Sequence, residues 1–388
     1  MRIAIICTLY PPYVLGGAEI STSLLAKGLA NKGHEVTVIT TGNKQKEEIV
    51  DGIRVYRIKN KNIYWRYPQR DKHIIRKSIW HLIDIYNIAY KKNIKELLCQ
   101  IKPDIVHTGN LCGLSTIVWS IAKSLKIPIV HTLRDYYLMC PQQTMMKGTS
   151  SCEKQCIICK SYSVIKKNLS QNVDAVIGIS KFILDKHLIS GYFKESKIRE
   201  VIPNSVDLKI DTNRRNKNHC IGYIGRLSPE KGLEFMIDAF NASNHYNYKL
   251  IIAGDGNKNY ANGLKEKYAS EDVHFIGKQS IADFLLNIDL LIVPSLWNEP
   301  FGRVVIEAYA AHCPVLIAEN GGLKELVNKN ISYTFNTNNT SSLIKLLNNF
   351  YKNKLFNNTD FDETFNEVLA QYSEERVIND YINIYCKI

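Results

Sequence analysis

Two glutamates eight residues apart, Glu299 and Glu307, stand in the stretch 293–307. Glu299 falls in a loop, and Glu307 falls inside a helix predicted over 304–311. A loop carboxylate can accept hydrogen bonds from sugar hydroxyls, and a carboxylate near a nucleotide can accept them from vicinal ribose hydroxyls. Glycosidases also use two carboxylates, as acid and nucleophile, so the pair alone leaves both chemistries open.

The start of that helix supplies a second kind of group. The first amides of a helix have no intrahelical partner, and the helix dipole favours an anion there. The candidate phosphate ligands are the backbone amides of Phe301, Gly302 and Arg303. Combined with the two carboxylates, they predict a site for a nucleotide joined to a sugar. The alternative is a capping acid followed by a surface helix.

Two cations, Arg226 and Lys231, follow a predicted strand over 220–224. Open α/β sheets bind ligands at the carboxyl ends of their strands. Fixed cations at such an edge can neutralise a diphosphate while it leaves. We therefore expect Arg226 and Lys231 to serve a diphosphate, and a solvated basic loop is the alternative.

Glycines mark two further strand ends. Gly16 and Gly17 separate a predicted strand over 3–7 from a predicted helix over 18–31. Adjacent glycines allow close backbone approach and leave amides for a phosphate, although the pattern is not the G-x-G-x-x-G of dinucleotide sites. Gly254 follows the predicted strand 248–253 in the same way. For each loop, a turn with no ligand is the alternative.

The apolar pattern alternates between short Ile- and Val-rich runs and longer helical ones, which predicts two doubly wound parallel sheets. A chain of 388 residues accommodates two such domains. The boundary is expected near 203–207, before a polar linker over 211–218. The predicted strands are 3–7, 35–40, 53–58, 105–107, 129–132, 175–179 and 199–202, then 220–224, 248–253, 273–276, 290–293 and 315–318.

Taken together, these motifs resemble the retaining glycosyltransferases of family 4, over nearly the whole chain. Further matching stretches are 103–107, 179–180, 203–207 and 321–325. The resemblance implies a GT-B fold, in which two Rossmann-like domains face a central cleft. Residues 1–203 would form an acceptor-side domain, with a C-terminal helix (about 370–388) packing back on it. Residues 204–369 would form the domain that binds the nucleotide-sugar donor.

The resemblance also implies a role for each motif residue. Arg226 and Lys231 would contact the diphosphate, Glu307 the ribose, and Glu299 the donor sugar. The backbone of Phe301, Gly302, Arg303 and Val304 would contact sugar and phosphate, and Gly16 and Gly17 would complete the cleft from the N-terminal side.

One position departs from the family pattern. Many members end the strand equivalent to 129–133 with His-Asp, whereas this chain has Arg134-Asp135. Arg134 and Asp135 are therefore candidate catalytic residues on the acceptor side, and His131 is an alternative to Arg134. For His107 and His131, a hydrogen-bonded packing role is favoured over a catalytic one.

Four cysteines lie close together in the sequence, and zinc binding is one interpretation. Structural zinc takes four thiolates in a tetrahedral array. The spacing is irregular for a zinc ribbon, so free thiols are an equal alternative and disulfides a lesser one. The candidate ligands are Cys140, Cys152, Cys156 and Cys159.

Positive charge is concentrated in the N-terminal half. Residues 1–200 hold 31 Lys and Arg against 15 Asp and Glu, and the segment 52–102 holds 13 against 3. This segment also interleaves aromatic residues with its cations, which predicts a patch for anionic lipid headgroups. A solvated basic surface is the alternative, and no recognition motif supports a nucleic-acid partner. The aromatic residues are Tyr56, Tyr64, Trp65, Tyr67, Trp80, Tyr86 and Tyr90.

The sequence thus predicts a retaining, metal-independent glycosyltransferase that uses a UDP- or GDP-sugar and a lipid-linked or glycan acceptor. The setting would be polysaccharide or lipopolysaccharide assembly in the cytoplasm, peripheral to the inner face of the plasma membrane. No run of 18 apolar residues predicts a membrane-spanning helix, and the apolar run at 3–7 is too short for a secretory signal. The alternatives are an epimerase or phosphorylase of the same fold and a non-catalytic binding module.

Overall fold

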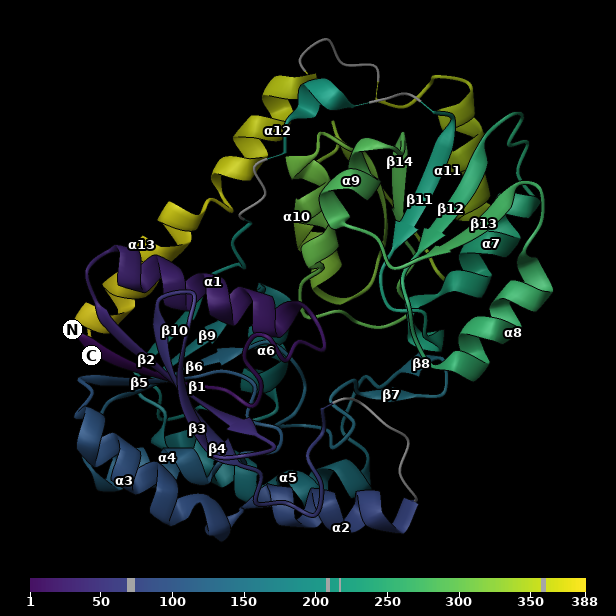
Figure 1. Ribbon diagram of the computed structural model, residues 1–388. Helices are drawn as coiled ribbons and strands as arrows, with labels where there is room; N and C mark the ends of the chain where they lie inside the picture. Colours follow the sequence, from purple (N-terminus) through teal and green to yellow (C-terminus); the bar gives the residue numbers. More distant parts are fainter. Residues whose placement is uncertain (68–73, 207–209, 216–217, 357–360) are drawn as a thin grey trace. The chain divides into compact units, whose positions relative to one another are not determined.

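The computed structural model describes residues 1–67, 74–206, 210–215, 218–356 and 361–388. They form two compact units (Figure 1). Unit 1 comprises Met1–Met145, Cys152–Ser205 and Glu374–Ile388, and unit 2 comprises Met146–Ser151 and Val206–Ser373. The boundary residue Asp207 and the linker residues 216–217 lie outside the described residues.

Unit 1 is built on a sheet with the strand order β10-β9-β6-β5-β1-β2-β4-β3. All neighbouring strands are parallel except β3 and β4. The central strands are buried on both faces, as their Ile- and Val-rich sequences predict. The strands are β1 (Arg2–Ile6), β2 (Glu35–Gly42), β3 (Lys46–Val50), β4 (Ile53–Lys59), β5 (Ile105–Thr108), β6 (Ile129–Leu133), β9 (Ala175–Gly178) and β10 (Ile198–Val201).

Helices cover this sheet, and the last of them comes from the far end of the chain. Helix α13 packs against α1, and its apolar side chains Val377, Ile378 and Tyr381 are part of the core that contains Ile3 and Ile5. The helices of unit 1 are α1 (Gly17–Asn31), α2 (Ile74–Ile85), η1 (Ile88–Tyr90), α3 (Lys91–Ile101), α4 (Ile117–Ser124), α5 (Ile157–Leu169), η2 (Ser170–Asn172), α6 (Lys181–Ile189) and α13 (Glu374–Cys386).

Unit 2 contains a fully parallel sheet with the order β13-β12-β11-β14-β15-β16. The order runs outward in both directions from β11 and β14. In sheets of this kind the crevice between two such strands receives ligands, because the loops that follow them diverge to opposite faces. The strands are β11 (Cys220–Ile224), β12 (Lys249–Ala253), β13 (Val273–Gly277), β14 (Leu290–Val293), β15 (Val315–Ala318) and β16 (Ser332–Phe335).

The remaining elements of unit 2 surround this sheet. A two-stranded hairpin, β7 (Met146–Lys147) and β8 (Ser150–Ser151), belongs to unit 2 although its sequence lies inside that of unit 1. Among the described residues, none of the helices combines the length and the apolar character that crossing a membrane requires. The helices are η3 (Thr212–Arg214), η4 (Pro229–Lys231), α7 (Leu233–Asn241), α8 (Lys258–Tyr268), α9 (Ile281–Leu286), α10 (Arg303–Ala310), η5 (Gly321–Leu326), α11 (Thr340–Tyr351) and α12 (Phe361–Ala370).

Candidate functional site

The loops after β11 and β14 are joined by an ion pair between Lys231 and Glu299. The Lys231 Nζ lies 2.8 Å from Glu299 Oε1, and the Trp297 ring lies 5.4 Å from the same nitrogen. Both charged side chains are largely shielded from solvent. Two residues that are 68 positions apart therefore meet at the point where the strand order reverses, which is the predicted ligand edge of the sheet.

Backbone hydrogen bonds fix the loop that carries Glu299. The amides of Leu296 and Trp297 donate to the carbonyl oxygen of Glu230, at 3.0 and 3.2 Å. On the other side, the amide of Gly322 in η5 donates to the carbonyl oxygen of Glu299 at 2.7 Å. Because main-chain groups make these bonds, the position of the Glu299 backbone depends on three loops rather than on its own side chain.

Glycine allows two of these loops to approach closely. Gly232, with φ +70°, leaves room for the carbonyl oxygen of Pro294, which would lie 2.1 Å from a Cβ atom. Gly321, with φ +60°, lies against the backbone of Asn298 and Glu299, and a Cβ atom there would be 2.5 Å from the Glu299 oxygen. Side chains other than hydrogen are excluded at both positions by contact with backbone that cannot move independently.

Arg226 occupies a more open position than Lys231. Its side chain is 46 % exposed and pairs with Glu230 at 2.9 Å. The Ser228 hydroxyl also donates to Glu230, at 2.7 Å. Burial acts to raise the pKa of Glu230, but these contacts and the nearby Lys231 hold it below its ordinary value. Glu230, which the sequence interpretation did not single out, therefore binds Arg226 through its carboxylate and the Glu299 loop through its backbone carbonyl.

Glu307 lies on helix α10 and is paired with Arg303. Arg303 Nε donates to Glu307 Oε1 at 2.6 Å, and the carboxylate is buried. Burial raises the pKa of Glu307, and the Arg303 charge offsets part of this rise. Gly302 caps the helix with φ +117°, so the predicted phosphate-binding amides of 301–303 lie at the first turn of α10. Arg303 was predicted to act through its backbone, and its side chain has this further role.

Gly254 lies in the turn after β12, where its amide donates to the carbonyl oxygen of Gly277 at 2.8 Å. The amide of Gly225, at the end of β11, donates to Ala253 in the same region at 3.1 Å. The turn is thus at the predicted sheet edge, but the amide of Gly254 is used within the sheet and is not directed at a ligand.

In the Gly16–Gly17 loop, the Gly16 amide also donates its hydrogen bond within the protein. Gly16 caps α1, and Gly17 is its first residue. The buried carboxylate of Glu19 accepts hydrogen bonds from the amides of Gly16, at 2.9 Å, and Leu15, at 3.3 Å. This corrects the expectation that the Gly16 amide faces a phosphate. An acid three residues into a helix is the sequence signal for such a cap, and it was missed.

Arg134 and Asp135 line a small pocket at the carboxyl ends of β5 and β6 in unit 1. Arg134 donates a hydrogen bond to the side-chain oxygen of Asn204. Asp135 accepts from the amide of Tyr137 at 2.8 Å, and its other carboxylate oxygen is buried with no hydrogen-bond partner among the described residues. Burial raises the pKa of Asp135, which the Tyr137 amide opposes.

The two histidines of these strands are held in the core of unit 1. His131 shares a hydrogen bond of 2.8 Å with the Thr108 hydroxyl, and its ring stacks on Phe193. His107 shares hydrogen bonds with Tyr385 and Thr132. Burial lowers the pKa of both imidazoles, so they are neutral near pH 7. This agrees with the packing role favoured from the sequence, although His131 also borders the pocket.

Three of the four clustered cysteines are neighbours in unit 1. Hydrogen bonds link the Cys159 thiol to the side chains of Cys140 and Cys156, and burial raises its pKa. Cys156 caps helix α5, where the amide of Cys159 donates to its sulfur at 3.4 Å. Among the described residues, no three His, Cys, Asp or Glu side chains are placed to hold a metal ion. Zinc would therefore have to draw these sulfurs closer together, and the zinc site stays a prediction.

Metal analysis tests that prediction directly. We expect about one zinc per chain in protein purified without added metal, because four thiolates can satisfy tetrahedral zinc. Cys159→Ser should lose the metal, and Cys99→Ser, which changes an exposed cysteine on α3, should keep it. A zinc content near zero in the parent protein, with all four thiols open to alkylation, would contradict the prediction.

Ser151 is a further residue that the sequence interpretation missed. It ends the β7–β8 hairpin of unit 2, and its hydroxyl donates to the carbonyl oxygen of Leu296 at 3.2 Å. The amide of Asn298 donates to the same hydroxyl at 3.2 Å. The hairpin thus contacts the loop that precedes Glu299. Only the contact reveals it, because a serine in a polar insertion carries no distinguishing sequence signal.

Three of the seven aromatic residues in the predicted patch over 52–102 lie in the interior of unit 1 and cannot face a membrane. Tyr56, Trp80 and Tyr90 are buried, and only Tyr86 reaches substantial exposure among the described residues. Trp80 Nε1 donates to the carbonyl oxygen of Tyr64 at 2.9 Å, so this ring is part of the packing. Residues 68–73 of the segment lie outside the described residues.

Both halves of the chain match known protein families. Residues 15–210 match the family described as Glycosyltransferase Family 4, and residues 207–368 match Glycosyl transferases group 1. An uncharacterized 42.6 kDa protein in the cps region of Klebsiella pneumoniae is 39 % identical over 330 residues, which cover 84 % of this chain and 87 % of that protein.

Solved structures of similar fold cover the whole chain. Sucrose-phosphate synthase from Thermosynechococcus elongatus has a TM-score of 0.75 at 18 % identity, covering 100 % of this chain and 98 % of that one. Anabaena HepE in complex with UDP has a TM-score of 0.74 at 18 % identity, with both chains fully covered. At this identity the likeness speaks for the fold alone, and it confirms the predicted fold class.

Proposed function

Because the chain belongs to glycosyltransferase family 4, we propose that it transfers a sugar from a nucleoside-diphosphate sugar to an acceptor hydroxyl with retention of the anomeric configuration. The observation that carries this proposal is the ion pair of Lys231 with Glu299 at the ligand edge of unit 2, 2.8 Å apart. A bound donor would place its diphosphate at Lys231 and its sugar hydroxyls at Glu299.

The chemistry of these groups supports the donor assignment. Breaking the bond between the anomeric carbon and the diphosphate oxygen builds negative charge on the leaving group. Lys231 and Arg226 can stabilise that charge, and the first turn of α10 adds positive potential. We therefore propose that these protein groups, rather than a catalytic metal ion, neutralise the diphosphate, with Glu307 on the ribose.

The acceptor half of the reaction rests on unit 1. We propose that Arg134 and Asp135, which line the pocket at the ends of β5 and β6, orient the acceptor. The acceptor would be a lipid-linked or polysaccharide hydroxyl in the assembly of capsular polysaccharide or lipopolysaccharide, at the cytoplasmic side of the membrane. The relative from a cps region supports this setting, and UDP-sugars and GDP-sugars are both donors to test.

A panel of UDP- and GDP-sugars tests the proposal. We expect one donor to raise the melting temperature of the chain, and the same donor to give a product whose anomeric configuration, read by NMR, equals that of the donor. An inverted product would contradict retention. Donor binding without hydrolysis or transfer would instead favour a binding module, and a changed donor sugar without an acceptor would favour an epimerase.

A further inference from the structure

Helix α2 carries an apolar stripe that faces away from the core of unit 1. Its members are spaced by three and four residues, so they share one side of the helix. Each is between 36 and 63 % exposed, whereas amphipathic helices of globular domains bury their apolar side. The stripe consists of Ile75, Ile79, Leu82 and Ile83, and Tyr86 follows directly after the helix.

Hydrogen bonds on the opposite side keep the stripe exposed. The buried carboxylate of Asp84 accepts from the amide of Gly113 at 2.7 Å. The amide of Asn87 donates to the Ser115 hydroxyl at 2.9 Å, and Trp80 is fully buried. Turning the stripe inward would break these bonds and expose Trp80, so the outward direction is a property of the fold.

Helix α5, which contacts α2, also carries exposed apolar residues. Four of its aliphatic residues are exposed, Ile157, Ile158, Val164 and Ile165. Its inner side holds Lys166, which is buried and donates to the carbonyl oxygen of Tyr137 at 3.2 Å. The two helices contact each other and run side by side (Figure 1). We call the exposed apolar residues of both helices together the α2–α5 face.

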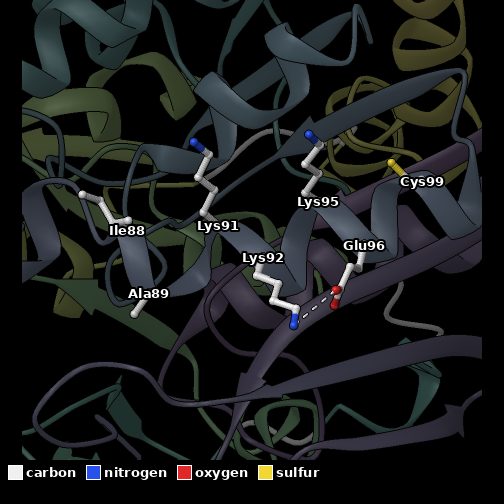
Figure 2. A pocket seen from close by; sticks show the side chains of 7 residues that line it. All are labelled: Ile88, Ala89, Lys91, Lys92, Lys95, Glu96 and Cys99. Atoms are coloured by element: carbon white, nitrogen blue, oxygen red, sulfur yellow. Dashed lines mark ion pairs between the residues drawn. The ribbon is translucent and has the colours of Figure 1, made fainter.

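Cations lie on α2 and in the segment that follows it along the chain. Arg76 and Lys77 are exposed on α2 itself. Ile88, which follows the stripe, lines a surface pocket together with Lys91, Lys92 and Lys95 (Figure 2). In that pocket Glu96 pairs with Lys92 at 3.9 Å, whereas Lys91 and Lys95 form no ion pair with a described residue. Exposed aliphatic residues together with such lysines suit a layer of acyl chains beneath anionic headgroups.

We propose that the α2–α5 face docks unit 1 on an anionic lipid bilayer, with its isoleucines at the headgroup–acyl boundary and Lys91 and Lys95 on headgroup phosphates. A second copy of the chain is a poorer occupant, because two-fold pairing of this face would bring the same lysines against each other. The inference uses only unit 1 and does not depend on the proposed reaction.

Vesicle co-sedimentation of the full chain tests the proposal. We expect binding to mixed phosphatidylcholine–phosphatidylglycerol vesicles, weakened by salt, and at least about tenfold less binding to phosphatidylcholine alone, since each cation near an anionic surface contributes about a factor of five. The double variant Ile79→Ser/Ile158→Ser should lower binding to the mixed vesicles about tenfold or more. Lys91→Glu/Lys95→Glu should do the same.

Matched controls lie elsewhere on unit 1. Ile189→Ser changes an 87 % exposed isoleucine at the end of α6, and Lys197→Glu reverses an exposed lysine before β10. Both should bind as the parent does. Equal binding to both kinds of vesicle, or binding unchanged in the face variants, would overturn the proposal. So would light scattering that shows a dimer in solution which Ile79→Ser/Ile158→Ser converts to a monomer.

Discussion

Replacing Lys231 by alanine is expected to lower kcat for sugar transfer by about 10²–10³-fold, the range seen when one preorganised charge-stabilising donor is removed. Its ammonium group is fixed by Glu299 and lies where the leaving diphosphate would gain charge. Steady-state kinetics with the donor identified by the nucleotide-sugar panel provide the measurement.

The fold should survive this change. Lys231 and Glu299 are 21 and 11 % exposed, so separating them should lower the free energy of unfolding by about 1–3 kcal/mol. Circular dichroism and thermal melting check this. Lys267→Ala is the matched control, because Lys267 is exposed on α8 and only loosely paired with Glu234, at 3.9 Å. If Lys231→Ala transfers sugar at a rate within a few-fold of the parent, Lys231 does not stabilise the leaving group.

The second large effect is expected for Gly321→Ala. A side chain at φ +60° costs about 1–2 kcal/mol, and its Cβ atom would overlap the backbone of Asn298 and Glu299. The Glu299 loop must then shift, and a displacement of about 1 Å in an active site can lower the rate about 10²-fold. We expect both a lower melting temperature and a loss of transfer of that order.

Gly263→Ala is the control in the same unit, because this glycine-to-alanine change should stabilise the protein. Gly263 lies in helix α8, and an added Cβ would meet no described atom within 4 Å. Alanine there should raise the free energy of unfolding by about 0.5–1 kcal/mol and leave the rate unchanged. If Gly321→Ala turns over as fast as the parent, the reaction does not depend on the position of the Glu299 loop. That result would contradict the role assigned to Glu299.

The sheet strands could be predicted because buried parallel strands are continuous runs of Ile, Val and Leu. The polar strand β3, with the sequence KEEIV, was not predicted, because a strand at the edge of a sheet needs no such apolar run. The short β16 and the β7–β8 hairpin were missed because no run of aliphatic residues marks them.

For the site, the sequence placed the motif residues at strand ends but could not pair Lys231 with Glu299, because their contact depends on loop geometry over 68 residues. The contact of Arg226 with Glu230 also depends on a loop. Arg303 and Glu307 lie four residues apart in α10, so their contact follows from helix geometry. Charge and aromatic content over 52–102 likewise did not reveal which residues face outward. Helical periodicity predicts that α2 has an apolar side. Whether that side faces the core or the solvent is decided by the hydrogen bonds of Asp84 and Asn87, which the sequence does not reveal.

Helix α13 has a consequence for the order in which the molecule is made. Its side chains Val377, Ile378 and Tyr381 complete the core of unit 1, yet they are synthesised after every residue of unit 2. A ribosome that has finished the first 205 residues therefore carries a unit whose core is still open. Unit 1 therefore cannot complete its core before unit 2 has been synthesised, so the two units cannot fold strictly one after the other in chain order.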